Sequence, residues 1–238
     1  MTIELLNTQE LREASLVVSG RLVDASNATL YGEVTVKGTE KFPVVYKPIA
    51  GERPLWDFPD GNLASREVAA YLISTWLDFG CVPPTVLRDG PYGTGAVQQW
   101  IEIDETVDVI ELGQSTAPGL RKLALLDVVI NNTDRKFGHI LPARDGAIFG
   151  CDHGVTFHSE FKLRTVIWQF AQEPLTPIEI SSLEKLLTFL QQQGNSQLAA
   201  LLTTSEISAL EGRIQGLIDE KEFPLPSADW PAVPWPPV

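Results

Sequence analysis

The chain has 238 residues, a formal net charge of −13 and 44% hydrophobic residues. This length allows one large domain or a two-lobed one, and the hydrophobic content excludes a largely disordered chain. The negative charge argues against nucleic acid as a partner, since phosphates and acidic side chains repel each other. Because no run of Lys or Arg offsets it, the charge also argues against stable association with anionic membranes.

Targeting and cysteine patterns predict a cytoplasmic protein. No apolar run approaches the roughly 20 residues that span a bilayer, and the first residues lack the basic and apolar regions of a signal peptide. The two cysteines, Cys81 and Cys151, are too few for a disulfide framework. We therefore expect both to be reduced thiols that pack as small hydrophobic groups.

The first hundred residues predict a β-rich region with one long helix. Residues 1–14 favour a short helix, and residues 15–20, 29–36 and 43–47 predict strands, with a turn at 24–27. A loop rich in Pro, Gly and aromatic residues follows at 50–61, and residues 63–77 predict a helix. Its expected buried stripe contains Val68, Leu72, Thr75 and Trp76. Residues 85–88 and 95–101 predict a second hairpin.

After about residue 104 the pattern becomes mostly helical. Residues 120–131, 163–171, 177–193 and 205–221 predict helices, and residues 140–142 and 147–149 predict a short hairpin. Thr176 ahead of Pro177 fits an N-cap, and Thr203 with Glu206 fits a capping box. The tail at 223–238 holds six prolines and two tryptophans. We expect it to lie against the body, because free tails rarely carry tryptophan.

Two aspartates carry most of the functional information. Asp134 follows the predicted helix at 120–131, and Asp152 follows a short apolar run, 18 residues later. Asp152 precedes His153 and Gly154, and the glycine permits a sharp turn that frees the carboxylate. In phosphoryl transfer one carboxylate orients the attacking hydroxyl and a second binds magnesium. The alternative for Asp134 is a turn-forming residue.

A lysine and a glutamate in the β-rich half complete this chemistry. Lys47 ends a predicted strand, where a phosphate-binding lysine is expected, and Glu67 lies 20 residues later on the predicted helix. A glutamate paired with such a lysine holds it in place. Glu52 is a rival partner for Lys47. The alternatives are a solvated lysine at a strand end and a surface glutamate.

These residues together resemble the catalytic and metal-binding loops of the phosphatidylinositol 3-/4-kinase superfamily, and Asn-Thr-Asp-Arg is also similar to the HipA-like bacterial kinases. The wider resemblance is to small bacterial phosphatidylinositol-kinase-like proteins, and it spans about residues 15–175. The motifs that carry it lie at residues 46–48, 51–59, 66–71, 82–91, 132–139 and 162–168. The resemblance implies an α+β, two-lobed, protein-kinase-like fold in a single domain, 1–238. Its parts would be an N-lobe and hinge at 15–102, a helical C-lobe at 103–222 and the tail at 223–238.

The resemblance also implies roles for individual residues. Lys47 would bind phosphates, Glu67 would pair with it, Asp134 would be the catalytic aspartate and Asp152 the metal ligand. The hinge, at Gln98, Gln99, Trp100, Ile101 and Glu102, would hold adenine through its backbone. The turn at 20–27 has only one glycine, so Ser26 and Asn27 would replace a glycine-rich loop over the phosphates.

The sequence departs from the kinase pattern in two places. His139 stands five residues after Asp134, where kinases usually place an asparagine as the second metal ligand. An imidazole is a poor ligand for Mg²⁺ and a better one for Mn²⁺ or Zn²⁺. His139 would therefore bind a softer metal, contact a phosphate or mark an impaired site. The short segment after Gly154, whose cations are Lys162 and Arg164, makes a lipid substrate less favourable.

The leading hypothesis is an ATP-dependent phosphotransferase that uses Mg or Mn and acts on a small molecule or a protein. Transfer of AMP in place of phosphate is a variant. The first alternative is a pseudokinase, a nucleotide-binding module without turnover. The second is a metal-dependent hydrolase that uses His139, Asp152 and His158 as ligands. The sequence leaves the acceptor open, although Arg53, Trp56 and Asp57 in the loop at 50–61 are candidates to line its site.

Overall fold

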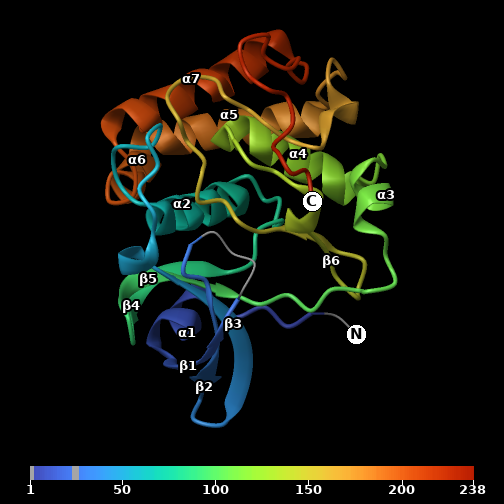
Figure 1. The fold of residues 1–238 in the computed structure, drawn as a ribbon. Helices are drawn as coiled ribbons and strands as arrows, with labels where there is room; N and C mark the ends of the chain where they lie inside the picture. Colours follow the sequence, from blue (N-terminus) through green and yellow to red (C-terminus); the bar gives the residue numbers. More distant parts are fainter. Residues whose placement is uncertain (1–2, 23–26) are drawn as a thin grey trace.

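A five-stranded antiparallel sheet forms the N-terminal part of the chain. The computed structural model describes residues 3–22 and 27–238. The strands are β1 (Ser15–Arg21), β2 (Leu30–Val36), β3 (Glu40–Pro48), β4 (Thr85–Gly90) and β5 (Gly93–Gln99), in the order β1-β2-β3-β5-β4 (Figure 1). All five were predicted from β-branched and aromatic patterns, although β3 begins at residue 40, earlier than expected. Its register with β5 pairs Lys47 with Ala96 in the middle of the sheet.

Two helices accompany the sheet. The short α1 (Thr8–Glu13) begins with a capping box at Asn7, and the guanidinium of Arg88 holds its C-terminal end through the carbonyls of Leu11 and Ala14. The longer α2 (Leu63–Trp76) has Asn62 as its N-cap. It packs on β4 and β5 on one side and on α4 (Pro118–Ile130) on the other. This helix therefore connects the sheet to the helical part of the molecule.

The predicted buried stripe of α2 was right in part. Val68 is buried, and Leu72 and Trp76 pack half-buried against the core, but Thr75 is exposed. The fully buried positions also include Ala69, Ala70 and Ile73, which lie off the predicted stripe. A single stripe is expected for a helix that buries one face. Because α2 lies between the sheet and α4, it buries side chains around most of its circumference, including Glu67.

The C-terminal part is mostly helical. It contains α3 (Val109–Gly113), α4, α5 (Pro177–Phe189), α6 (Asn195–Leu198) and α7 (Thr204–Glu220), with a hairpin of β6 (Ile140–Pro142) and β7 (Ile148–Gly150) (Figure 1). Its core joins leucines from α4, α5 and α7, such as Leu123, Leu183 and Leu210. The predicted N-cap at Thr176 and capping box at Thr203 are confirmed, and Thr176 also forms a capping box with Glu179. None of the helices in the described ranges is long and apolar enough to cross a membrane.

The predicted helix at 163–171 was wrong. Only a short turn, Trp168–Phe170, is helical there, and Thr165 forms a parallel bridge with Arg135. Burial alternates through this segment, with Leu163, Thr165 and Ile167 buried and the residues between them half-buried. This period of two belongs to an extended chain. The helix predicted at 177–193 is also shorter, since its last turn, Leu190–Gly194, widens into a π-helix.

The tail at 223–238 lies along the helical part. The carbonyl of Ala232 accepts hydrogen bonds from the backbone of Thr165 and the indole of Trp168, at 3.0 and 2.7 Å. Closer to its end, the carbonyl of Pro237 accepts from the backbone N–H of Phe137 at 2.8 Å. Phe137 and Thr165 belong to segments that flank the two aspartates in sequence. The tail therefore braces the loops on which the candidate site depends.

Candidate active site

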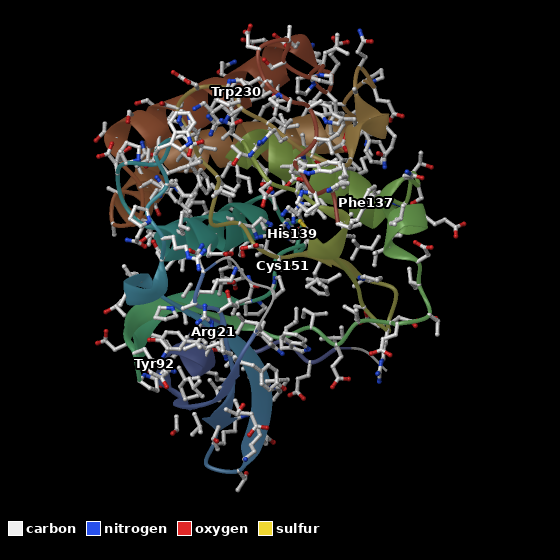
Figure 2. The ribbon with its side chains drawn as sticks, in the orientation of Figure 1. Arg21, Tyr92, Phe137, His139, Cys151 and Trp230 are labelled. Atoms are coloured by element: carbon white, nitrogen blue, oxygen red, sulfur yellow. The ribbon has the colours of Figure 1, made fainter. Side chains whose placement is uncertain are left out.

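A cleft between the sheet and the helices collects most of the predicted site residues. Its walls come from β3, α2, the loop after α4 and the turn after β7. The side chains that line it and can carry chemistry are Asn27, Thr29, Lys47, Glu52, Glu67, Asp134, Lys136, His139 and Asp152. In Figure 2, His139 and Cys151 lie at this boundary between sheet and helices.

Lys47 is held between two carboxylates. Its ammonium forms an ion pair with Glu67 on α2 and lies 2.9 Å from Oδ1 of Asp152. Burial alone would lower the pKa of Lys47, but the attraction of Asp152 and Glu67 outweighs it and raises that pKa. The same attraction, chiefly from Lys47, lowers the pKa of Asp152. Both groups are therefore charged at neutral pH.

Glu67 also joins the two halves of the site. Its second oxygen, Oε2, accepts a hydrogen bond from the backbone N–H of His153 at 3.0 Å. Burial raises the pKa of Glu67, against the opposing attraction of Lys47. The rival, Glu52, does not pair with Lys47. Its carboxylate accepts from the backbone N–H groups of Leu63 and Ala64, both at 2.9 Å, and so caps α2.

Asp134 is positioned by the asparagine two residues before it. The side-chain oxygen of Asn132 accepts from the backbone N–H of Asp134 at 3.0 Å, and the side-chain amide of Asn132 donates to Asp127 at 2.9 Å. Asn132 and Asp127 are fully buried, so the loop rests on a rigid base. Burial raises the pKa of Asp134, while nearby Lys136 lowers it by a smaller amount. A raised pKa suits a carboxylate that accepts a proton.

A buried charge network joins the loop of Asp134 to the turn of Asp152. The guanidinium of Arg135 contacts both oxygens of Asp127, donates to the carbonyl of Cys151 at 2.9 Å and lies 2.7 Å from Nε2 of His153. Burial lowers the pKa of His153 well below its usual range, so the ring is neutral and Nε2 accepts from Arg135. The sequence indicated Asp134 and Asp152 but not this network. The one sign of it was Asp127, a charge inside an apolar helix.

Gly154 has a different role from the one expected. The residue in the left-handed conformation is Asp152 itself, at φ 58°, and not Gly154. A Cβ on Gly154 would lie 3.1 Å from the Cβ of Leu63 on α2. The glycine therefore lets the turn approach the helix that carries Glu67, which keeps Asp152 within reach of Lys47.

His139 faces Asp152 across the cleft. Its Nε2 lies 3.5 Å from Oδ2 of Asp152, and its Nδ1 is buried without a partner among the described residues. Burial lowers the pKa of His139 to about 4, so the imidazole is neutral and its nitrogens can act as ligands. An imidazole beside a carboxylate fits a divalent ion that accepts nitrogen, such as Mn²⁺.

The ligand set of the hydrolase alternative does not assemble. His158 turns away from the cleft, where its Nδ1 accepts from the backbone N–H of Glu160 at 3.0 Å and its ring packs on Phe58. Across residues 3–22 and 27–238, no three His, Cys, Asp or Glu side chains gather closely enough to hold a metal ion by themselves. A site built on His139, Asp152 and His158 is therefore wrong for this fold.

Lys136 is a second cation in the cleft that the sequence did not single out. Its ammonium lies 3.7 Å from Oδ2 of Asp134. The side chain is about a fifth exposed and lines the same cavity as Lys47. The available sign was its place two residues after Asp134, which puts both side chains on one side of an extended loop.

The predicted adenine- and phosphate-binding residues are only partly in the cleft. The side chain of Gln98 donates to Thr85 at 2.8 Å, and that of Gln99 binds the backbone of the N-terminal segment at residues 4 and 6. Trp100 packs edge-on against Tyr31, and Ile101 is buried. None of these four lines the cavity. Asn27 does line it, whereas Ser26 lies outside the described residues.

Comparisons of sequence reveal relatives of two kinds, and no family model matches the chain. The chain is 40% identical to protein Rv2133c of Mycobacterium tuberculosis, in an alignment that covers 95% of this chain and 93% of that protein. It is 29% identical to phosphatidylinositol 4-kinase gamma 4 of Oryza sativa subsp. japonica, over 66% of this chain and only 33% of the kinase. The predicted resemblance to phosphatidylinositol kinases is thus supported by one distant sequence match. This match does not show that the chain belongs to that family, and membership of the HipA-like kinases is not shown either.

Two solved structures share the fold. The Golgi casein kinase superimposes with a TM-score of 0.57 and 16% identity, over 90% of this chain and 72% of its own. The structure of hydra Fam20 with sugar gives a TM-score of 0.57 and 13% identity, over 90% of this chain and 86% of its own. The predicted α+β, two-lobed, kinase-like fold is confirmed.

Proposed function

We propose an ATP-dependent phosphotransferase function for this chain, which belongs to the family of the mycobacterial protein Rv2133c. The observation that carries the proposal is the position of Lys47 between Glu67 and Asp152, in a cleft of a kinase-like fold that also contains Asp134. Catalysis of phosphoryl transfer depends mainly on positioning and on neutralising charge. The cleft supplies both, because Lys47 and Lys136 and the carboxylates of Glu67, Asp134 and Asp152 line one open cavity.

The two lysines have distinct roles in this proposal. Lys47, fixed by Glu67, binds the phosphates that leave with ADP. Lys136, next to Asp134, lies where it can neutralise charge on the transferred group. Negative charge spreads over the equatorial oxygens of that group during the reaction, so a cation at this point lowers the barrier. Asn27 contributes its side chain at the cavity edge, where a phosphate-covering loop is expected.

Asp134 orients the acceptor hydroxyl and accepts its proton. The oxygen of the acceptor forms a bond to the γ-phosphorus while the bond from that phosphorus to the β–γ bridging oxygen breaks. The products are ADP and a phosphate ester, and the proton leaves through Asp134. The hydrogen bond from its backbone N–H to Asn132 keeps the carboxylate in place for this step.

Asp152 and His139 are the residues that would hold a divalent cation. The donor set fits such an ion, because the ionised carboxylate of Asp152 and Nε2 of the neutral His139 ring face each other 3.5 Å apart. When bound, the ion would neutralise phosphate charge. With His139 in place of the usual asparagine, Mn²⁺ should support nucleotide binding at least as well as Mg²⁺. A titration with strict preference for Mg²⁺ would argue against His139 as a ligand.

The adenine contact falls to the backbone after β5. The N–H groups of Gln99 and Trp100 already donate to the carbonyls of Pro84 and Pro43, at 2.9 Å each. We therefore assign adenine recognition to the backbone of residues 101 and 102, at the end of the predicted hinge.

A pseudokinase is the second candidate, and one observation favours it. Asp152 makes a direct ion pair with Lys47, so a nucleotide-bound metal must compete with the lysine for this carboxylate. A protein that binds nucleotide without turnover would retain Lys47 and Glu67 as phosphate contacts. Binding and turnover therefore have to be measured separately.

A thermal-shift titration with ATP tests the first step. The melting temperature is measured with ATP alone and with added Mg²⁺ or Mn²⁺, and a ligand at about 100 times Kd adds about 2.7 kcal/mol of stability. The shift should disappear in Lys47→Met and persist in Lys41→Met, since Lys41 lies on the same strand but is exposed. Absence of any shift with wild type contradicts both the kinase and the pseudokinase proposals.

Labelled ATP tests the second step. A kinase transfers label from γ-labelled ATP and none from α-labelled ATP, whereas transfer of AMP gives the reverse. Nucleotide binding with no transfer and no ATP hydrolysis in either case assigns the chain to the pseudokinases. Small hydroxyl compounds serve as the acceptors in this assay.

A further inference from the structure

A second cavity opens beside the catalytic one. It has a volume of about 350 Å³ and shares Asn27, Asp134 and Asp152 with the first. Its other walls come from three separate segments: the loop at 50–61, the segment after Gly154 and the tail. Cavities of roughly 300–1,000 Å³ accommodate small molecules. Asp134 is common to both cavities, so a hydroxyl in the second one can reach the carboxylate that accepts its proton.

Two tryptophans give this cavity its aromatic walls. Trp56 belongs to the loop at 50–61 and Trp230 to the tail, which Figure 2 shows on the α7 side of the molecule. The buried ammonium of Lys162 lies 4.5 Å from the ring centre of Trp230 and 5.7 Å from that of Trp56. A cation over a ring face holds it in place. Lys162 does not line the cavity, so it positions the two rings from outside.

The polar groups of the walls include both donors and acceptors. Arg164 lines the cavity, with its Nε fixed by the carbonyl of Thr133 at 2.7 Å, and Asp57 contributes a carboxylate. Asp134 and Asp152 add two further carboxylates at the shared end. Among the described lining residues three carboxylates outnumber the one guanidinium, so the lining carries no net positive charge with which to attract an anion. This argues against a phosphorylated or carboxylated acceptor.

We propose that this cavity binds the acceptor, and that the acceptor is a small, neutral, polyhydroxylated ring such as a sugar or a cyclitol. The flat apolar face of such a ring packs on tryptophan, while its hydroxyls both donate and accept hydrogen bonds. Arg164 then donates to the ring, Asp57 accepts from it, and one hydroxyl is directed to Asp134. The inference rests on the proposed phosphotransferase function and names its substrate class.

Ligand-observed saturation-transfer NMR tests binding without any need for turnover. The full chain with ADP and Mn²⁺ is mixed separately with D-glucose, N-acetyl-D-glucosamine, myo-inositol and maltotriose, and with D-glucose 6-phosphate as the anionic comparison. At least one of the neutral compounds should receive saturation. A preference for maltotriose would identify a glycan end as the source of the ring, and a preference for a single ring would identify a free compound. Saturation of glucose 6-phosphate alone, or of no probe, overturns the proposal.

Two tail variants supply the matched comparison. Trp230→Ala should weaken binding of the neutral ring tenfold or more, while the thermal shift produced by ATP stays unchanged. Trp235→Ala, in the same tail but 88% exposed and outside the cavity, should leave both unchanged. Equal effects of the two variants on the neutral ring would contradict a specific role of Trp230. A parallel loss of the ATP shift in Trp230→Ala would assign Trp230 to the fold and not to the acceptor.

Transfer kinetics separate this proposal from the proposed function. Where the NMR probe is also phosphorylated, Trp230→Ala should raise the KM for that compound about tenfold and leave the KM for ATP within about twofold. Binding of a neutral ring without phosphate transfer would contradict the phosphotransferase function, but it would support the assignment of the cavity to neutral rings. ATP-dependent labelling of dephosphorylated casein, with no neutral ring bound, would retain the function and overturn the cavity's assignment.

Discussion

Two charge clusters lie close together in this molecule and differ in their access to the cleft. In the first, Asp127 and Arg135 are fully buried, and the guanidinium of Arg135 donates hydrogen bonds to Asp127, to His153 and to backbone carbonyls. In the second, Lys47 joins Glu67 and Asp152, but Lys47 is 21% exposed and Asp152 54% exposed. The first cluster is closed to ligands, whereas the second has a carboxylate that faces the cleft. The difference separates charges that build the site from charges that can act in it.

The largest expected effect concerns Asp134, which sits between the two clusters. Its loop rests on the closed cluster through Asn132, but its carboxylate faces the open one. Asp134→Asn should lower kcat about 10²- to 10⁴-fold, the usual contribution of a general base, with ATP binding retained. The exposed Asp78→Asn is the control, and its kcat should match wild type. Equal turnover of Asp134→Asn and wild type would remove Asp134 from the mechanism.

Breaking the closed cluster should affect folding before chemistry. Arg135→Met leaves Asp127 buried without its cation, and such a loss costs about 3–5 kcal/mol of folding free energy. Unfolding in urea, followed by circular dichroism, measures the change. Combining the variant with Asp127→Leu should recover part of the loss, because the unpaired buried charge is then gone. A single variant with unchanged stability would mean that the cluster is not structural.

The open cluster should tolerate loss of a carboxylate far better. In Glu67→Gln, Lys47 keeps its contact with Asp152, so we expect a decrease of about 1 kcal/mol or less in unfolding free energy. The Lys47 ammonium is then less well fixed, and the KM for ATP should rise about tenfold. Urea unfolding and initial-rate kinetics give the two values. A stability loss as large as that of Arg135→Met would show that the open cluster stabilises the fold as much as the closed one does.

The same contrast explains what the sequence could predict. Lys47, Glu67, Asp134 and Asp152 stand at strand ends, helix faces and turns, where local patterns are readable, and the structure brings all four to one cleft. The closed cluster joins Asp127, Arg135 and His153 through folding, and no local spacing indicates which charges are buried together. The roles of the four cleft residues remain predictions that the experiments above address.

The segment at 163–171 was wrongly predicted for a related reason, because distant contacts determine its structure. Its apolar residues fit a helical stripe when read alone, yet the segment is extended and pairs with the loop of Arg135. Hydrogen bonds from residues distant in sequence decided its structure, including those of Arg164 to the backbone of Asn132 and Thr133. Tertiary contacts override local propensity most often in segments as short as this one.

The smallest expected effect is a change in the reaction rate of the Cys81 thiol, which lies beside the closed cluster. Cys81 is buried near Arg135, its carbonyl accepts from the backbone N–H of Gly150 at 2.7 Å, and burial raises its pKa to about 11. At pH 8 only about one thiol in a thousand is then ionised, and only the thiolate attacks a disulfide reagent. Cys81 should therefore react with Ellman's reagent orders of magnitude more slowly in the folded protein than in urea. Its rate should rise measurably in Arg135→Met, and remain at the wild-type value in Glu67→Gln. Equal acceleration in both variants would show that the two clusters loosen together and are one structural unit.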